Sequence, residues 1–248
     1  MTDLNGRTAL VTGAARGIGL AIAQRMQSDG ATVLICDTLA AQLEQAEMKL
    51  SGRTEVFRHA GDVRDTAAIE AWLNDLDRWP DILVNNAAIA PRATALALDA
   101  TLLSETMEIN FVAAVRLSQL VAGRLIAQGK AGAIVNIASV NAFRGQPELL
   151  HYNASKAALV SATKTLAAEW ACHQIRVNAV CAGSTWTDIW EEGGFSDEDK
   201  KRFAAKNPLG RFARPSEIAA AAAFLVSDDA SFVTGEALIA DGGLTVLM

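Results

Sequence analysis

The stretch Thr12-Gly13-Ala14-Ala15-Arg16-Gly17-Ile18-Gly19 follows an apolar run, Thr8–Thr12, and opens a helical pattern. Its three glycines have separate uses. Gly13 allows a sharp turn out of a strand, Gly17 lets backbone approach a pyrophosphate, and Gly19 lets the helix lie close to the sheet. The N–H groups and partial positive charge of a helix N-terminus attract phosphate. The stretch therefore predicts a dinucleotide-binding loop, with an ordinary glycine-rich turn as the alternative.

Short apolar runs alternate with helical patterns over almost the whole chain. The expected strands are Thr8–Thr12, Ala31–Cys36, Glu55–His59, Ile82–Asn85, Ala133–Ala138, Ile175–Val180 and Ala237–Ala240. Near-continuous apolar strands between helices indicate a parallel sheet covered on both faces. The pattern predicts an α/β, Rossmann-like, doubly wound sheet in a single domain over residues 1–248. Residues 185–208 are too long and too aromatic for an ordinary connection, so we expect a substrate lid there.

An acidic residue ends the second expected strand. Asp37 stands 18 residues after Gly19 and is followed by Thr38. A carboxylate there can bind the ribose hydroxyls and repels the additional phosphate of NADP. NAD is therefore the expected cofactor, with NADP the less favoured one, because Arg16 could contact a phosphate. A helix N-cap is the structural alternative for Asp37.

Composition excludes several classes of protein. Hydrophobic residues make up 51% of the chain and charged residues 20%, with a formal net charge of −6. This balance fits a globular core and argues against a nucleic-acid partner, which needs a basic surface. No signal peptide and no apolar run of about 20 residues for a membrane span is visible, so we expect a cytoplasmic protein. Cys36, Cys172 and Cys181 lack metal-ligand spacing and are expected to be buried free thiols, with no metal site.

Tyr152 and Lys156 are four residues apart, so both lie on one face of a helix. An unperturbed tyrosine, with a pKa of about 10, is a poor base at neutral pH. A neighbouring ammonium and a positively charged nicotinamide ring both favour the phenolate. The pair could then exchange a proton with a secondary alcohol or a ketone. A solvated helix face is the structural alternative.

Together these motifs resemble the short-chain dehydrogenase/reductase family over nearly the whole chain. Further matches are Asn85-Asn86-Ala87-Ala88, where the family has N-N-A-G, the 13-residue step from Ser139 to Tyr152, and Asp241-Gly242-Gly243. The resemblance implies an NAD(P)-dependent oxidoreductase acting on CH–OH groups. Its catalytic residues would be Asn110, Ser139, Tyr152 and Lys156.

The resemblance also implies a role for each catalytic residue. Tyr152 would be the acid/base, and Lys156 would lower its pKa and hold the nicotinamide ribose. Ser139 would bind the substrate oxygen, and Asn110 would hold a water in a proton relay. The implied cofactor-binding set is Gly13, Arg16, Gly17, Ile18, Gly19, Asp37, Asp62, Val63, Asn86, Ala87, Tyr152, Lys156, Gly183, Thr185 and Thr187.

The chain departs from the family pattern at two positions. Ala88 replaces a glycine, a change that we expect to be tolerated. Ala182 stands before Gly183 where the family has proline. Proline fixes φ, so we expect a looser turn under the nicotinamide.

The substrate pocket should lie beyond the strand ends, where strand order reverses. Its expected lining residues are Asn141, Phe143, Gln146, Trp186 and Trp190. This mixture of apolar and amide groups favours a sugar, polyol or small hydroxy acid. Arg92 and Arg144 could hold a carboxylate, although a solvated surface position is the favoured interpretation for both. We expect His151 to point away from the face that carries Tyr152 and Lys156.

Three functions remain open from sequence. The first is an NAD(H)-dependent oxidoreductase that interconverts a secondary alcohol and a ketone. The second is a 3-oxoacyl-[acyl-carrier-protein] reductase using NADPH, against which Asp37 and the net charge count mildly. The third is a catalytically silent NAD-sensing protein, against which the intact catalytic set counts. Apolar outer faces of two long helices, together with the resemblance, predict a homotetramer.

Overall fold

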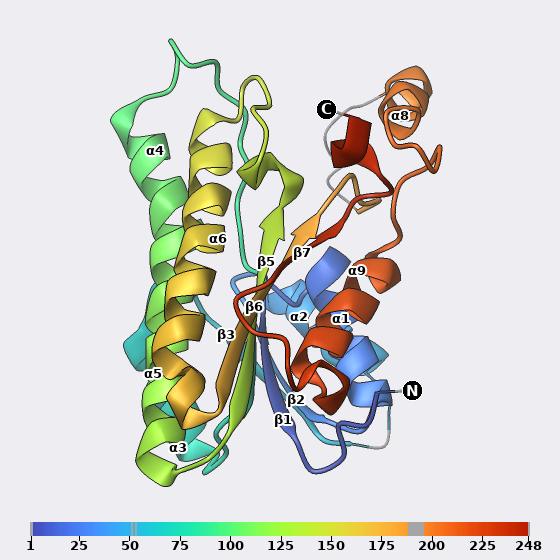
Figure 1. Cartoon of the computed structure of the whole chain (residues 1–248). Coiled ribbons are helices and arrows are strands. Elements are labelled where there is room, and N and C mark those ends of the chain that lie inside the picture. Colours follow the sequence, from blue (N-terminus) through green and yellow to red (C-terminus); the bar gives the residue numbers. More distant parts are fainter. Residues whose placement is uncertain (1, 51, 53, 188–195, 248) are drawn as a thin grey trace.

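The computed structural model describes residues 2–50, 52, 54–187 and 196–247. Seven strands form one parallel sheet in the order β3-β2-β1-β4-β5-β6-β7 (Figure 1). The strands are β1 (Thr8–Thr12), β2 (Thr32–Asp37), β3 (Val56–Ala60), β4 (Ile82–Asn85), β5 (Gly132–Ser139), β6 (Ile175–Ala182) and β7 (Ala237–Ala240). The predicted doubly wound parallel sheet is confirmed.

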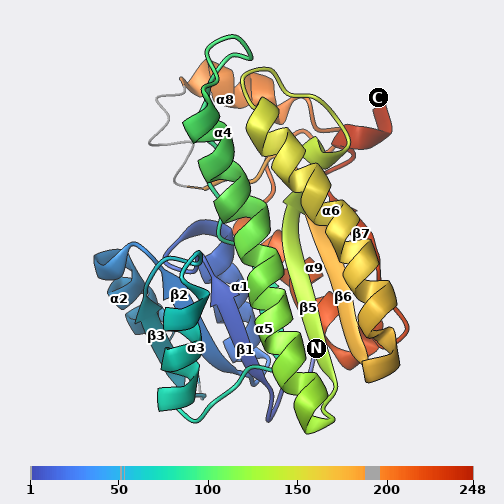
Figure 2. The same ribbon diagram turned by 90° about the vertical axis from the view of Figure 1, so that its left-hand side faces the viewer.

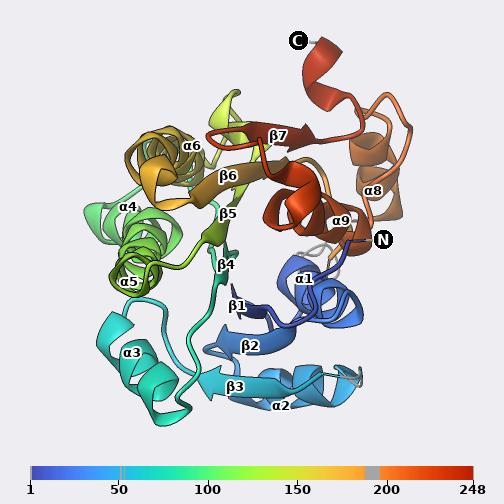
Figure 3. The same cartoon turned by 60° about the horizontal axis from the view of Figure 1, so that its bottom comes forward.

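Helices cover both faces of the sheet, as the end-on view in Figure 3 shows. One layer contains α3 (Thr66–Asp75), α4 (Ala100–Met107), α5 (Ala113–Gln128) and α6 (Leu150–Trp170), and the other contains α1 (Gly17–Ser28), α2 (Ala40–Lys49) and α9 (Pro215–Val226). Helix α8 (Asp197–Ala204) lies beyond the carboxyl ends of the strands (Figure 2). The edge of the sheet at which open α/β sheets bind ligands is therefore the end that carries α8.

The core has two halves, one on each face of the sheet. Leu10 and Val11 are neighbours in β1, and both are fully buried. Leu10 belongs to the cluster that includes Leu117 of α5, whereas Val11 belongs to the cluster that includes Ile22 of α1. Successive side chains of a strand point to opposite faces, so both faces must be apolar. This is why the strands appear in the sequence as continuous apolar runs.

Strand order reverses at β1. Val11 pairs with Ile35 of β2 on one side and with Val84 of β4 on the other. The chain moves outward from β1 to β3 and then crosses back to β4. Open α/β sheets bind ligands in the crevice at such a switch point. The loop that begins at Gly13 leaves β1 at this place.

Some strands are longer than predicted. Strand β5 continues through Ser139 and β6 continues through Ala182, and these two residues pair with each other. Ala182 also pairs with Ala240 of β7. Ala182 is therefore paired on both sides, with β5 and with β7, and a proline there would have no N–H to donate. The looser turn expected at this position stays a prediction.

One expectation about the cysteines is wrong. Cys36 and Cys181 are buried free thiols, but Cys172 is exposed. It lies in a short 3₁₀ turn, Ala171–His173, that follows α6 at the surface. The apolar residues around it in the sequence belong to the last turns of α6, whose buried side does not extend to Cys172.

The predicted lid, residues 185–208, is described only in part. Residues 188–195, which include Trp190, lie outside the described residues. Helix α8 begins with a capping box, in which the Ser196 hydroxyl accepts from the Asp199 N–H and the Asp199 carboxylate accepts from the Ser196 N–H. The single-domain, lid-bearing organisation stays a prediction.

One helical run, Ala100–Gln128, is long and apolar enough to span a membrane by length and composition, with a mean hydropathy of 1.3. We did not expect this from sequence. The run packs on the sheet through buried residues such as Leu117, Val121 and Leu125. Such burial is typical of a core helix.

Candidate active site

The glycine loop is held tightly against the end of β4. The Asn86 side chain donates to the carbonyl oxygens of Thr12 and Gly13, each at 2.9 Å. A Cβ on Gly13, whose φ is +64°, would lie 2.8 Å from the Ala87 Cα, and a Cβ on Gly19 would lie 2.1 Å from the Gly13 oxygen. Only glycine fits at both positions, so the predicted close approach of helix and sheet is present.

Thr12 has a role that the sequence analysis missed. Its hydroxyl accepts from the N–H groups of Asn86 at 3.0 Å and Ala87 at 3.1 Å. Asn86 and Ala87 were predicted to contact cofactor, and in the structure they first of all fix the loop. A threonine at the end of a strand that directly precedes the glycine loop was the available signal.

The start of α1 is open to an anion. The N-cap residue, Arg16, makes no side-chain capping hydrogen bond in the helix. Gly17 has a φ of +58°, and a Cβ there would contact the Thr187 side chain at 3.4 Å. Uncapped N–H groups at a helix N-terminus bind phosphate. Gly17 and Thr187 are therefore neighbours, while Ile18 packs against the core, and their contacts with cofactor stay a prediction.

The carboxylates predicted to contact the adenosine have different partners. Asp37 accepts from the N–H of Ala15 at 3.0 Å and of Leu39 at 3.1 Å, so it lies between the glycine loop and the end of β2. Asp62 is paired with Arg64 at 2.6 Å, which holds the pKa of the Asp62 carboxyl below its usual value. Val63 is buried in the core. Asp37 is thus the carboxylate nearest the loop.

The segment after β6 is fixed by its neighbours. A Cβ on Gly183 would lie 2.6 Å from the Asp241 Cα, which requires glycine there. The Thr185 hydroxyl donates to the Gly183 oxygen at 3.1 Å, and Thr185 pairs with Ala213 as an isolated bridge. These contacts fix the segment after β6, and its Thr187 lies next to Gly17 of the glycine loop.

Tyr152, Lys156 and Ser139 meet at the end of β5. The Lys156 Nζ lies 5.7 Å from the centre of the Tyr152 ring and donates to the Ile137 oxygen at 2.7 Å. Burial raises the pKa of Tyr152 above its ordinary 10.0, and a hydrogen bond with Ser139 opposes this. Without the positively charged nicotinamide ring of a bound cofactor, the Tyr152 phenol is therefore kept protonated. The Ser139 hydroxyl also accepts from the Asn141 N–H at 3.2 Å.

Lys156 is only 3% exposed. Burial lowers its pKa to about 8, and the nearby Cys181 acts in the opposite direction. Desolvation disfavours an ammonium because a low-dielectric interior solvates charge poorly. The ammonium of Lys156 therefore has a pKa close to neutral pH.

Asn110 lies in a π-helical turn, Glu108–Val112, where the Ala113 N–H donates to the Glu108 oxygen five residues back. Its amide accepts from the Ile89 N–H at 2.8 Å and donates to the Ile89 oxygen at 2.9 Å. It also donates to the Ser155 hydroxyl at 3.1 Å. Ser155 in turn donates to the backbone carbonyl oxygen of Tyr152 at 2.8 Å. π-Turns are frequent at functional sites. Asn110 thus links the segment after β4 to the helix that carries Tyr152.

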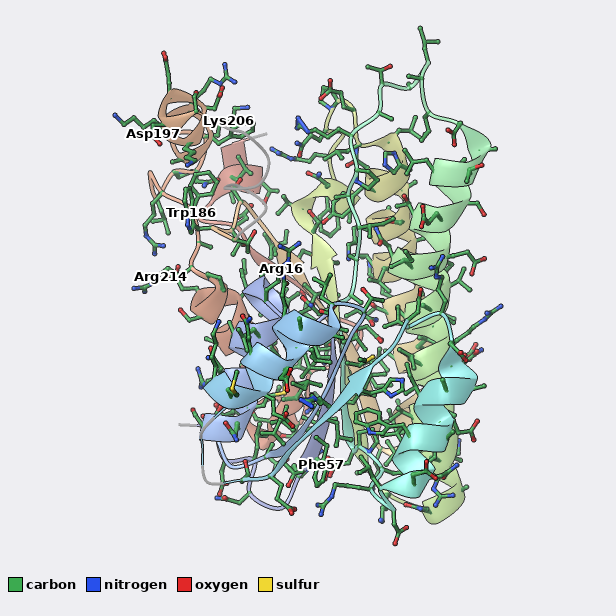
Figure 4. All side chains as sticks on the ribbon, turned by 180° about the vertical axis from the view of Figure 1, so that it is seen from behind. Arg16, Phe57, Trp186, Asp197, Lys206 and Arg214 are labelled. Atoms are coloured by element: carbon green, nitrogen blue, oxygen red, sulfur yellow. The ribbon has the colours of Figure 1, made fainter. Side chains whose placement is uncertain are left out.

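The residues predicted to bind substrate divide into three groups. Asn141 is buried, and its amide donates to Gln146 at 3.0 Å and accepts from Arg144 at 3.3 Å. Phe143 is exposed beside this loop. Trp186 lies above the strand ends (Figure 4), where its ring meets Phe212 at 5.5 Å. The fifth residue, Trp190, lies outside the described residues.

His151 is fully buried, and its Nε2 lies 2.8 Å from the Pro91 oxygen. It therefore packs against the segment after β4.

A pH-dependent stability follows from the burial of Lys156. The folded chain releases the Lys156 proton near pH 8, whereas an unfolded chain keeps it to about pH 10.5. Between these values unfolding takes up a proton, so stability rises with pH by about 1.4 kcal/mol per unit. We expect the free energy of unfolding of wild type minus that of Lys156→Met to increase by about 2–3 kcal/mol from pH 7 to pH 10.

Denaturant unfolding at the two pH values measures this difference. Lys164→Met, an exposed position on the same helix, is the control and should show no such increase. Parallel pH profiles for wild type and Lys156→Met would contradict the burial of a charged Lys156.

Comparison with known proteins agrees with this geometry. A family model described as Enoyl-(Acyl carrier protein) reductase matches residues 13–245. Galactitol 2-dehydrogenase of Agrobacterium fabrum is 35% identical, with 97% of this chain and 98% of the relative covered. The 3-oxoacyl-[acyl-carrier-protein] reductase FabG of Aquifex aeolicus is also 35% identical, with 97% and 98% covered.

Solved structures give the same result. A putative short-chain alcohol dehydrogenase from Sinorhizobium meliloti superposes with a TM-score of 0.92 at 36% identity, covering 98% of both chains. A gluconate 5-dehydrogenase from Burkholderia cenocepacia, solved in complex with NADP and tartrate, superposes with a TM-score of 0.91 at 32% identity, covering 98% of this chain and 97% of that one. The chain therefore belongs to the short-chain dehydrogenase/reductase family and is an oxidoreductase that interconverts a secondary alcohol and a ketone.

Proposed function

We propose that this oxidoreductase is an NAD(H)-dependent dehydrogenase of a sugar, polyol or small hydroxy acid, with Tyr152 as its general acid/base. One observation carries the proposal. The Tyr152 phenol lies beside the buried Lys156 at the end of β5, where the nearby Ser139 hydroxyl opposes the rise in the pKa of Tyr152. A phenol with two such neighbours can exchange a proton with a substrate oxygen.

In the proposed reaction a secondary alcohol loses its O–H proton to the Tyr152 phenolate and its C–H hydride to the cofactor, which leaves a ketone. The bound nicotinamide supplies the hydride chemistry. The Ser139 hydroxyl holds the substrate oxygen. The Lys156 ammonium favours the phenolate and holds the nicotinamide ribose.

Asn110 has a positioning role in this proposal. Its amide holds Ile89 and Ser155, and Ser155 bonds the backbone oxygen of Tyr152. A relay water beside Lys156 would be positioned by the same π-turn. Catalysis in this site therefore depends on Asn110, Ser139, Tyr152 and Lys156 together.

The residues that fit a dinucleotide are those around the glycine loop. Gly13 and Gly19 have no room for side chains, Gly17 has a φ of +58° that disfavours them, and the start of α1 offers N–H groups to the phosphates. The other proposed contacts are Arg16, Ile18, Asp37, Asp62, Val63, Asn86, Ala87, Tyr152, Lys156, Gly183, Thr185 and Thr187.

Asp37 supports NAD over NADP. Its carboxylate bonds the Ala15 N–H in the loop, close to where the adenosine ribose would lie. A carboxylate there accepts hydrogen bonds from ribose hydroxyls and repels a 2′-phosphate. The same residue argues against the NADPH-dependent 3-oxoacyl reductase as the alternative function.

The proposal includes assembly and location. Exposed apolar side chains on α9, after it and on β7, namely Phe224, Phe232 and Ile239, support a homotetramer. The buried free thiols Cys36 and Cys181 support the reducing cytoplasm. Sedimentation at micromolar concentration tests the homotetramer, and a monomer would contradict it. Cell fractionation tests the cytoplasmic location, and a secreted pool would contradict it.

The acid/base role is tested with Tyr152→Phe. We expect kcat to fall by about 10²–10⁴-fold, the usual contribution of general acid–base catalysis. NADH binding, followed by cofactor fluorescence, should change little because the ring is kept. The assay uses the best substrate from a screen of polyols, sugars, hydroxy acids and β-ketoacyl thioesters. Turnover retained in Tyr152→Phe would refute the assignment.

The cofactor is tested with Asp37→Asn, which keeps an acceptor for the Ala15 N–H and removes the charge. Wild type should bind NADH at least about 10-fold more tightly than NADPH, and the variant should lose most of this preference. Asp62→Asn, where the carboxylate is already paired with Arg64, should leave the preference unchanged. A wild-type preference for NADPH would contradict the proposal.

A further inference from the structure

A charged cleft is lined by residues of the loop that joins Ser139 to Tyr152. It has a volume of about 320 Å³ and is formed by the segment after β4, the loop after β5 and the end of α8. Its lining residues include Arg92, Arg144, Glu148, Phe203 and Lys206. This volume is at the lower end of the range for small-molecule sites. The cleft is therefore large enough for part of a small substrate.

Among the described residues, the lining carries three cations and one carboxylate, although the chain as a whole has a net charge of −6. Arg92 is paired with Glu148 at 3.2 Å. Arg144 uses its Nε to donate to Asn141 at 3.3 Å. The Lys206 Nζ lies 4.7 Å from the centre of the Phe203 ring. The balance of charge therefore favours an anion between Arg144 and Lys206.

The acidic residues of α8 do not line the cleft. Asp197, Glu198 and Asp199 lie in its first turn, while Phe203 and Lys206 lie at its other end. Figure 4 shows Lys206 nearer the middle of the molecule than Asp197. A second cavity, of about 310 Å³, contains Arg211, but there Glu217 pairs with both guanidinium Nη groups at 2.7 Å. The described lining of the cleft at Arg144 therefore carries an excess of positive charge, whereas Arg211 in the second cavity is paired with Glu217.

The two sides of the cleft are fixed to each other before any ligand binds. The Ala93 N–H donates to the Glu148 oxygen at 3.0 Å, which ties the segment of Arg92 to the loop of Arg144. Glu148 adopts a left-handed φ of +67° to make this turn. Non-glycine residues rarely hold such a conformation unless the surrounding contacts demand it. The arginines are therefore held by backbone contacts.

A short chain of contacts joins the cleft to the catalytic residues. The Asn141 amide accepts from Arg144, and the Asn141 N–H donates to the Ser139 hydroxyl. The Asn153 amide, next to Tyr152, donates to the Gln146 oxygen at 3.1 Å. These contacts fix the loop that carries Arg144 to the strand end of Ser139 and to the helix of Tyr152.

We propose that the cleft binds the carboxylate of an anionic polyol, so that the substrate is a hydroxy acid of the aldonate class whose secondary alcohol is oxidised at Tyr152. This inference rests on the proposed function. The planar guanidinium of Arg144 suits a carboxylate because two N–H groups match its two oxygens. Lys206, which follows α8, adds a second positive charge to the same cleft.

The test compares aldonates with alditols of the same length and configuration, using wild type, Arg144→Gln and Lys206→Gln. Wild type should show a kcat/KM for the best aldonate at least about 10-fold above that for its matched alditol. Each variant should lower this ratio about 10- to 100-fold, the range for a hydrogen bond to a charged group, mainly through KM. Lys206→Gln keeps the test valid if Arg144→Gln fails to fold.

Arg202→Gln is the matched control, because Arg202 lies on α8, is mostly exposed and is paired with Asp199. It should leave the ratio unchanged. Preference for the alditol, or a ratio unaffected in both variants, overturns this inference alone. Absence of any polyol or hydroxy-acid oxidation, or exclusive reduction of β-ketoacyl thioesters, overturns the proposed function with it.

Discussion

The site depends on a buried ammonium. The Lys156 Nζ donates to the Ile137 oxygen at 2.7 Å, deep beside the end of β5. Burial of a cation is unfavourable, and its pKa of about 8 reflects that cost. The hydrogen bond to Ile137 offsets part of that cost. A cation placed next to Tyr152 in this way can shift a phenol that is otherwise held protonated, and a cofactor bound at the glycine loop adds to the effect.

Much of this arrangement could be predicted from sequence. The inner strands were found because both of their faces are buried, which leaves uninterrupted apolar runs such as β5, whereas the edge strands β3 and β7 are only partly buried. The glycine loop and Tyr152 with Lys156 were found because close backbone approach and helical spacing leave a local signature. Sequence order and spacing therefore determine the sheet, the switch point and the face of α6 that carries the chemistry.

Other features had no local signature. Thr12 and Ser155 act through hydrogen bonds to residues far along the chain, to Asn86 and Asn110. The exposure of Cys172 depends on where α6 leaves the surface. Arg92 and Arg144 resembled surface arginines because the contacts that bring them to one cleft are made between segments more than 50 residues apart, through Glu148 and Ala93. Such pairings are set by tertiary packing, and the residues alone do not reveal them.

The central claim is that the phenol of Tyr152 is tuned by its surroundings. Tyr152 is the only tyrosine in the chain, so the near-ultraviolet absorbance of tyrosinate reports on this residue alone. The account predicts that the apoenzyme titrates with a pKa above 10.0, because burial raises it. Saturating oxidised cofactor should bring the midpoint below that of a free tyrosine, and Lys156→Met should prevent the shift. A midpoint that does not move when the cofactor binds would contradict the account.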